Sequence, residues 1–244
     1  MRTKLRLSDW LVERPFALAM SSGFFSFFAH TGMLGALSDR GHAPSSVSGS
    51  SAGALVGGAW AAGVSADELA AQLAGLRRDD FWDPAFGAGL LAGKRFDALL
   101  RALLPVTSMR ACRVPLQISA FAIARRATEV LHDADLVHAI RASCAVPGLF
   151  HPVRIGPRAY WDGGILDRPG LAGVPDGARI LYHHIAGHGP VPHRANMVTL
   201  VLDGLPRSGP FKLDAGRRAM ELARQLVARA LDTDVADGVV RIAA

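Results

Sequence analysis

The chain carries one serine whose surroundings fit a nucleophile. Ser51 lies in the uncharged stretch VSGSSAGALVGG at residues 47–58, where Gly49, Ser51 and Gly53 form the pattern G-x-S-x-G. This pattern is typical of a strand-to-helix turn that presents a serine hydroxyl at its tip, and its small residues let neighbouring backbone approach closely. A glycine-rich loop or a small-residue helix face would produce the same five-residue pattern. The pattern therefore indicates a nucleophile only together with a second residue that can accept the serine proton.

Asp162 is the candidate base for that serine. It follows the apolar pair Tyr160 and Trp161 and precedes Gly163 and Gly164, which indicates a strand end in a tight turn. An ordinary Asp-Gly hairpin turn has the same pattern. A free Asp with a pKa of about 3.9 is a weak base for a hydroxyl. Desolvation by aromatic neighbours raises the carboxyl pKa toward the range that base catalysis requires.

The elements that must position these groups alternate along the chain. Strands are expected at 16–20, 46–49, 114–123, 128–131, 153–155, 159–161, 180–184 and 197–202. Helices are expected at 27–37, 52–62, from Ser65 onward, 96–104, 136–143 and 214–231. This alternation predicts an α/β protein, a three-layer α/β/α fold with a central, mostly parallel sheet. The turn at Ser51 then lies at the carboxyl ends of the strands, where open α/β sheets place their sites.

Length and composition favour one domain over residues 1–244, with a basic leader at 1–14, a motif-bearing core at about 16–170 and a C-terminal part at 171–244. Half of the 244 residues are apolar, which suits one sizeable core. The net charge of +6 comes from scattered basic residues without the stripe and stacking aromatics of a nucleic-acid site, so no nucleic-acid partner is expected. Two cysteines in apolar segments, Cys112 and Cys144, favour buried thiols in a reducing compartment.

Two uncharged stretches, 15–37 and 41–66, bear on localisation, because a basic amino end precedes the first as in a signal peptide. Ser, Gly and His residues interrupt both stretches, whereas a membrane span is more continuously apolar. We therefore expect buried core and a cytoplasmic protein with peripheral membrane contact, secretion being the alternative. No cluster of histidine and carboxylate has metal-ligand spacing, so neither a metal nor another cofactor is expected.

Three ordered blocks resemble the patatin-like phospholipase family: GSSAGAL at 49–55, RASCAVPGLFHPV at 141–153 and YWDGGILDRP at 160–169. His30, Gly32 and Leu34 also match an H-x-G-x-L element of that family. The resemblance implies a patatin-like fold and a lipid acyl hydrolase that uses a Ser-Asp dyad without a histidine. Ser51 is then the nucleophile and Asp162 the base, and the acyl-enzyme is hydrolysed by water. A lipid or ester substrate is implied.

The family's oxyanion loop, usually G-G-G-x-R-G, is altered here. This chain has Ser22-Gly23-Phe24-Phe25-Ser26-Phe27, so one glycine survives and the basic residue is replaced. If the loop turns as the family's does, Phe24 takes a positive φ, which strains a bulky aromatic residue. Backbone N–H groups do not depend on the side chain, so we expect an active variant hole built from Ser22, Gly23 and Phe24.

Two alternatives stay open. A serine, an aspartate and then a histidine is the chain order of an α/β-hydrolase triad, and four histidines follow Asp162: His183, His184, His188 and His193. A non-catalytic module that binds lipid or a protein partner would also suit the altered loop and the many arginines.

Three further groups have two interpretations each. The aromatic segment 81–91 is either an acyl-chain groove or lid, or a loop that covers the core. His30 either supports the oxyanion loop or is a half-buried structural histidine. Arg141 either steers anionic head groups or pairs near its helix end.

Overall fold

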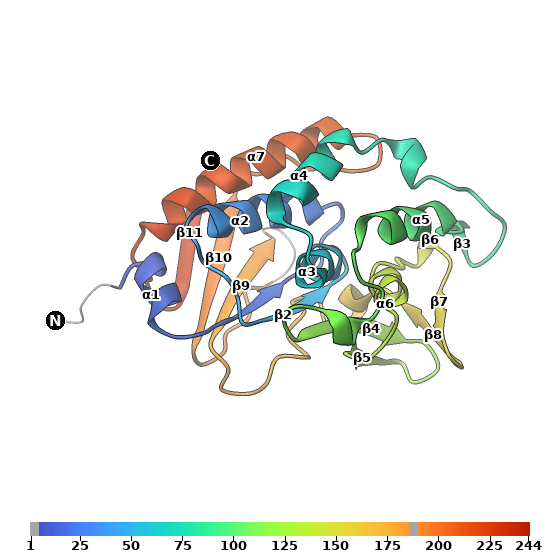
Figure 1. Cartoon of the computed structure of the whole chain (residues 1–244), viewed down its shortest axis with the longest axis horizontal. Helices are drawn as coiled ribbons and strands as arrows, with labels where there is room; N and C mark the ends of the chain where they lie inside the picture. The colour runs from blue at the N-terminus through green and yellow to red at the C-terminus, as the bar shows by residue number, and fades with distance from the viewer. Residues whose placement is uncertain (1–4, 186–189) are drawn as a thin grey trace.

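A nine-stranded sheet forms the centre of the computed structural model, which describes residues 5–185 and 190–244 (Figure 1). Its strands are β1 (Ala17–Met20), β2 (Ser46–Ser50), β4 (Leu116–Ala122), β5 (Ala127–Leu131), β7 (Val153–Ile155), β8 (Arg158–Trp161), β9 (Ile180–Ile185), β10 (Met197–Asp203) and β11 (Val239–Ala243). The order across the sheet is β11-β10-β9-β1-β2-β4-β8-β7, and β5 also pairs with β4. The pairs from β11 to β4 are parallel, whereas β5, β8 and β7 join antiparallel. A separate parallel pair joins β3 (Gly89–Leu91) to β6 (Gly148–Phe150).

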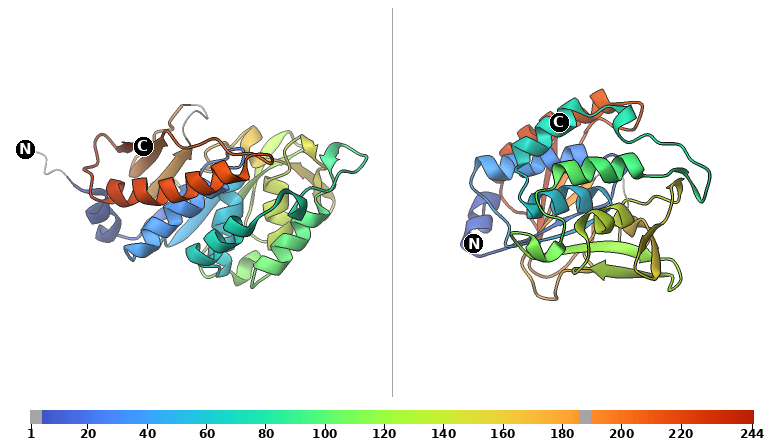
Figure 2. Two further views of the ribbon diagram at one scale, coloured as in Figure 1. Left: turned by 90° about the horizontal axis from the view of Figure 1, so that it is seen from above. Right: turned by 45° about the vertical axis from the view of Figure 1, so that its right-hand side comes forward.

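Helices flank this sheet, and the longest of them lies beside the helix that follows β1 (Figure 2). The α-helices are α1 (Leu7–Glu13), α2 (Phe27–Asp39), α3 (Ala52–Ala62), α4 (Ala66–Gly75), α5 (Lys94–Leu103), α6 (Leu136–Ser143) and α7 (Leu213–Leu231). Three short 3-10 helices, η1 (Arg78–Asp80), η2 (Met109–Ala111) and η3 (Gly163–Ile165), complete the elements. The α/β class and the mostly parallel central sheet with flanking helices are therefore confirmed.

Strand β1 is buried on both faces, which places it at the centre of the core. Side chains alternate along a strand, so Leu18 and Met20 face the large core that α2, α3 and α7 cover. Ala17 and Ala19 face the other way and pack against the irregular segment 171–178. The carboxyl end of β1 leads into residues 21–26, and the carboxyl end of the neighbouring β2 leads to Ser51. Both segments therefore meet at one edge of the sheet.

The expected strands and helices are present, with boundaries shifted by no more than two residues. Ser65 accepts a hydrogen bond from the Glu68 N–H at 3.1 Å, as its capping pattern predicts. Among the described residues, seven short elements were not expected: α1, β3, β6, β11 and the three 3-10 helices. Helix α1 falls in the basic leader, yet its Leu7 and Leu11 are buried in the main core. Within 5–185 and 190–244, no helix has the length and apolar character needed to cross a bilayer.

Candidate active site

Ser51 lies in the strained turn between β2 and α3, with φ 51° and ψ −116°. Few non-glycine residues adopt a positive φ, and such strain is common at functional sites. Two glycines make the turn tight. A Cβ added to Gly49 would lie 2.5 Å from the Gly53 carbonyl carbon, and one added to Gly53 would lie 2.1 Å from the Met20 carbonyl oxygen. Larger residues would therefore push α3 away from both strands.

Asp162 lies against Ser51 at the end of β8. The Ser51 Oγ donates a hydrogen bond of 2.7 Å to Asp162 Oδ2, although 111 positions separate the two residues. The other carboxylate oxygen, Oδ1, accepts the Gly164 N–H at 2.7 Å. Gly163 lies so close to the next strand that an added Cβ would be 2.1 Å from the Ser119 carbonyl oxygen. The two glycines thus let the aspartate reach the serine.

Burial changes the proton affinity of this carboxylate. Asp162 is only 7% exposed. Desolvation raises its pKa to about 6, while hydrogen bonds from Ser51 and Gly164 and the charge of Arg168 act in the opposite direction. A carboxylate with this pKa is mostly ionised at neutral pH and is a stronger base than an exposed aspartate.

The residues that precede β6 hold the turn from the other side. Ser143 Oγ accepts the Ser51 N–H at 2.8 Å and donates to the Ser119 carbonyl oxygen at 2.6 Å. The Cys144 thiol donates to the Ser51 carbonyl oxygen at 3.2 Å, and burial raises the pKa of this thiol. Sequence analysis gave Ser143 no role. The only signal was its place in the block at 141–153.

The loop after β1 differs from the expectation in one respect. The residue with positive φ is Phe25 (58°), not Phe24. The Ser26 N–H donates to the Gly23 carbonyl oxygen at 3.1 Å and closes a tight turn, so the strained position falls one residue later. Phe25 packs in this conformation against Phe27 and Phe81.

Several backbone N–H groups near the serine have no protein acceptor among the described residues. The Ser22 N–H donates to the Arg168 carbonyl oxygen at 2.7 Å, so it is already used. Over the part of the chain that the structure describes, the N–H groups of Gly23, Phe24 and Ala52 donate to no protein acceptor. All three residues line the same cavity as Ser51. Sequence analysis missed Ala52, although the residue after the nucleophile in G-x-S-x-G commonly supplies such a donor.

A mostly apolar cavity of about 440 Å³ opens beside the Ser51 hydroxyl. Its walls come mainly from α3, α4, α5 and β6 and include Leu55, Val56, Leu69, Leu73, Phe96, Leu99, Leu103, Leu149 and Phe150. Phe24, Ile165 and Arg168 line the cavity and are also exposed to solvent, so they mark its mouth. This shape suits a hydrocarbon chain whose carbonyl end lies at Ser51.

Comparison with known proteins agrees with this geometry. The family model of the patatin-like phospholipases matches residues 18–173. The chain belongs to this family. Uncharacterised NTE family proteins of Mycobacterium tuberculosis and Mycobacterium bovis are 34% identical over 155 residues, which is 62% of this chain and 43% of each relative. The chain therefore spans less than half the length of these curated relatives.

Two solved structures share the patatin-like fold. VipD from Legionella pneumophila superposes with a TM-score of 0.66 at 14% identity, covering 89% of this chain and 67% of that one. The type III effector protein ExoU gives a TM-score of 0.51 at 16% identity, covering 89% of this chain and 52% of that one. At such identities the likeness concerns the fold alone. The family model confirms the family that the sequence blocks resemble, and the two structures confirm the fold.

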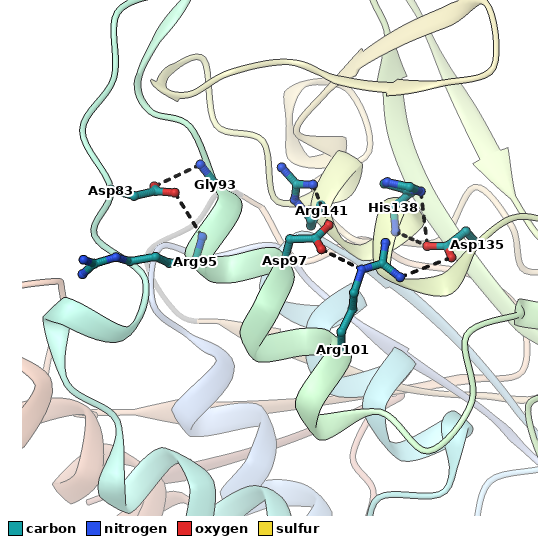
Figure 3. Close-up of polar contacts among 8 residues, drawn as sticks. All are labelled: Asp83, Gly93, Arg95, Asp97, Arg101, Asp135, His138 and Arg141. Carbon is teal, nitrogen blue, oxygen red and sulfur yellow. Dashed lines mark hydrogen bonds and ion pairs between the residues drawn. The ribbon is translucent and has the colours of Figure 1, made fainter.

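In this patatin-like chain, the aromatic segment 81–91 has two parts. Phe81, Trp82 and Leu91 line the cavity, whereas Phe86, at the tip of the hairpin that the segment forms, is fully exposed. At the base of the hairpin, Asp83 accepts the N–H groups of Gly93 and Arg95, each at 3.0 Å (Figure 3). The ends of the segment thus line the cavity and its tip projects into solvent, and its role as an acyl-chain groove or lid stays a prediction.

A second, separate set of polar contacts anchors the helix that forms one cavity wall. Asp97 on α5 accepts hydrogen bonds of 2.7 Å from Arg101 and from Arg141 on α6 (Figure 3). Arg101 also approaches Asp135 at 3.8 Å, and Asp135 pairs with His138 at 3.3 Å. Arg141 therefore pairs at its helix end and does not line the cavity.

The histidines lie away from the patatin-like dyad. His30 Nδ1 is 2.8 Å from His183 Nδ1, and His30 Nε2 is 2.8 Å from the Ser21 carbonyl oxygen. His184 Nδ1 is 3.1 Å from the Tyr182 hydroxyl. In the described part of the chain, neither His30 nor His183 hydrogen-bonds to Ser51 or Asp162. His193 is exposed, and His188 lies outside the described residues.

Across 5–185 and 190–244 there is no group of three or more His, Cys, Asp or Glu side chains that could hold a metal ion. His30 is fully buried, and its Nε2 contacts the Ser21 carbonyl oxygen at the start of the loop that follows β1. This contact is compatible with both interpretations of His30, so its role stays a prediction.

Proposed function

We propose that the protein hydrolyses carboxylic esters of lipids through Ser51 and Asp162. The single observation that carries this proposal is the hydrogen bond of 2.7 Å between the Ser51 Oγ and the buried Asp162 carboxylate. Membership of the patatin-like phospholipase family supports the general class of lipid hydrolase. The apolar cavity beside the hydroxyl supports an acyl chain as the group that is bound.

The proposed reaction begins with attack of the Ser51 Oγ on the ester carbonyl carbon, while its proton passes to Asp162 Oδ2. The tetrahedral intermediate collapses, the ester C–O bond breaks, and Asp162 returns the proton to the leaving alkoxide, which departs as an alcohol. Water then attacks the acyl-enzyme and gives its proton to Asp162. The second intermediate releases the carboxylic acid, and the proton returns to Ser51.

The negative charge of each intermediate falls on the former carbonyl oxygen. We place this oxygen among the free N–H groups of Gly23, Phe24 and Ala52, because they line the cavity next to Ser51. Removing one donor of this kind typically lowers the rate by about 100- to 1000-fold. The donors are backbone groups, so the aromatic side chains of this loop do not remove them.

We also propose that the cavity mouth contacts a membrane surface. Apolar side chains are exposed around the mouth: Phe24 and Ile165 line it, Leu166 follows Ile165, and Phe211 packs on Trp82 with ring centroids 5.6 Å apart. The hairpin tip adds Phe86. Such a rim lets a lipid enter the cavity without crossing water.

Sedimentation with phosphatidylcholine vesicles tests the membrane contact. We expect Phe211→Ser and Phe86→Ser to reduce the vesicle-bound fraction. Val12→Ser is a matched control, since Val12 is 70% exposed on α1 but does not line the cavity. Equal binding by all three variants and the parent chain would show that the rim is not the contact surface.

Labelling with a fluorescent organophosphonate tests the nucleophile. The parent chain should be labelled and should hydrolyse p-nitrophenyl esters, and Ser51→Ala should do neither. Ser50→Ala is the control, because the neighbouring Ser50 hydroxyl is buried without a hydrogen-bond partner among the described residues. Labelling that survives Ser51→Ala would refute the assignment. An unlabelled parent chain that hydrolyses no ester would favour a non-catalytic lipid-binding module.

A further inference from the structure

Arg168 is the one basic side chain among the described residues that line the cavity. It is exposed at the mouth, and its guanidinium makes no hydrogen bond or ion pair within 5–185 and 190–244. Most arginines of this chain are paired: Arg141 with Asp97, Arg224 with Asp39 and Arg158 with Glu129 are examples. A free guanidinium beside an apolar cavity is therefore available to a ligand.

The position of Arg168 ties it to the reacting atoms. Its carbonyl oxygen accepts the Ser22 N–H at 2.7 Å, so its backbone is joined to the loop that carries Gly23 and Phe24. Its positive charge also acts on Asp162. A group bound by Arg168 would consequently lie close to an ester held at Ser51.

Asp162, the only acid among the described residues that line the cavity, forms no hydrogen bond or ion pair with this arginine. Asp162 Oδ2 accepts from Ser51 and Oδ1 accepts from Gly164, and neither oxygen has a hydrogen bond to the guanidinium. A guanidinium presents paired N–H donors whose geometry matches a phosphate or a carboxylate. The remaining wall is mostly apolar, so an anion at the mouth would find its one strong partner here.

We propose that Arg168 binds a negatively charged group, a phosphate or a carboxylate, next to the scissile ester, and so selects anionic lipid esters over neutral ones. The selection between substrates rests on the proposed hydrolysis, because it is expressed in turnover. The binding of the anion by Arg168 does not depend on catalysis. Arg168 is thus a specificity-determining residue, and the acyl chain and the anion occupy opposite ends of one site.

The first test compares two substrates that differ only in the charged group, dihexanoyl phosphatidic acid and dihexanoylglycerol, at pH 8 where Asp162 is ionised. We expect Arg168→Gln to lower the ratio of their kcat/KM values by about 10- to 100-fold, which is the usual effect of losing a charge-assisted hydrogen-bond pair. Arg168→Lys should retain part of the ratio, since it keeps the charge but not the planar donors. Arg154→Gln is the control, because Arg154 is an exposed, unpaired arginine of the described chain that does not line the cavity. An unchanged ratio in Arg168→Gln overturns the proposal, even if the kcat/KM values for both substrates fall by the same factor.

The second test measures binding without turnover. Calorimetry with dihexanoyl phosphatidic acid should show tighter binding to Ser51→Ala than to the double variant Ser51→Ala, Arg168→Gln. Equal affinities of the two variants overturn the proposal, whether or not the parent chain hydrolyses esters. A difference in affinity, together with a parent chain that hydrolyses no ester, supports the anion site and refutes the proposed function. Inorganic phosphate is titrated in parallel. If it binds as tightly as the lipid and only when Arg168 is present, free phosphate rather than a head group is the ligand of the site.

Discussion

The molecule contains two polar pairs, each hydrogen-bonded across a long stretch of chain, which differ in their access to the cavity. Ser51 and Asp162 are 2.7 Å apart and 111 positions apart in the chain, and His30 and His183 are 2.8 Å apart and separated by 153 positions. The first pair joins the residues that follow β2 and β8, whereas the second pair joins helix α2 to the interior of β9. Among the described residues that line the cavity beside Ser51, the first pair is present and the second is not.

Burial acts on both pairs in the same sense, because it favours the neutral form of each group. It raises the pKa of Asp162 to about 6 and lowers the pKa of His30 to about 4, and it also lowers the pKa of His183. A perturbed pKa by itself therefore does not identify a catalytic group. Access from the cavity and the strained φ of Ser51 distinguish the dyad.

The hydrogen-bond roles in the histidine pair follow from its contacts. His30 Nε2 must donate to the Ser21 carbonyl oxygen, so His30 Nδ1 accepts and His183 Nδ1 donates. His183 Nε2 is then a buried acceptor, and it has no partner among the described residues. Both ring nitrogens of His30 are thus hydrogen-bonded, whereas the one free nitrogen of His183 contacts neither Ser51 nor Asp162 in the described part of the chain.

The largest expected effect comes from Asp162→Asn. An amide cannot accept the serine proton, so we expect ester hydrolysis to fall by about 1000- to 10,000-fold, the size typical of losing a general base. The substitution should also raise the free energy of unfolding. Ester turnover and urea denaturation of the same preparations measure the two effects.

The sign of that stability change follows from the pKa. Asp162 titrates at about 6 in the folded chain and at 3.8 as a free group. An acid whose pKa is raised by folding contributes stability that is fully present below its unfolded pKa. This contribution is lost as the pH rises through the folded pKa, which is about 6 for Asp162. At pH 8 the ionised carboxylate thus costs on the order of 2–3 kcal/mol, which Asn removes. Asp162→Asn should stabilise at pH 8 and give no gain at pH 4; equal effects at both pH values would contradict the raised pKa.

The second effect concerns the histidine pair. His183→Leu leaves His30 Nδ1 as a buried acceptor without a donor, so we expect the free energy of unfolding to fall by about 1–3 kcal/mol at pH 8. His183→Asn is the matched variant, because its amide N–H can replace the Nδ1 donor, and it should lose less. Urea denaturation at fixed pH compares the variants. If His183→Leu instead abolished the turnover of folded protein and left its stability unchanged, the triad alternative would regain support.

Much of this architecture is predictable from the sequence, because it depends on local patterns. Apolar runs and capping residues predict most strands and helices, and the motifs at Ser51 and Asp162 predict two residues that the structure brings together. Their catalytic roles stay predictions. The position of Phe25 was not predictable, since its carbonyl oxygen accepts from the Ser208 hydroxyl at 3.0 Å, a contact 183 positions away. The His30–His183 contact likewise has no local signature.

A third prediction separates the two pairs by pH. The base must be ionised to act, so kcat/KM for a neutral ester should fall as the pH decreases through about 6 and should be about tenfold below its plateau at pH 5. His30 acts on stability instead. Its lowered pKa gives a contribution that is complete above 6.5 and is lost as the pH falls toward about 4. Circular dichroism at each pH distinguishes inactivation from unfolding, and an activity profile that followed the unfolding curve would contradict a separate titration of Asp162.

The smallest expected effects concern one buried hydroxyl beside each pair. Ser143 Oγ holds the Ser51 N–H at 2.8 Å, so Ser143→Ala should loosen the strained turn and lower kcat about tenfold, with a stability loss of about 1–2 kcal/mol. Thr31 follows His30 in α2, and its buried Oγ1 has no partner within the described residues. Thr31→Val removes this unsatisfied hydroxyl at nearly constant shape, so it should leave kcat unchanged and keep stability the same or raise it slightly. Ester kinetics and urea denaturation of the two variants test this difference. We expect the hydroxyl near the dyad to affect turnover and the hydroxyl near the histidines to affect stability alone. A loss of kcat in Thr31→Val as large as in Ser143→Ala would contradict this expectation.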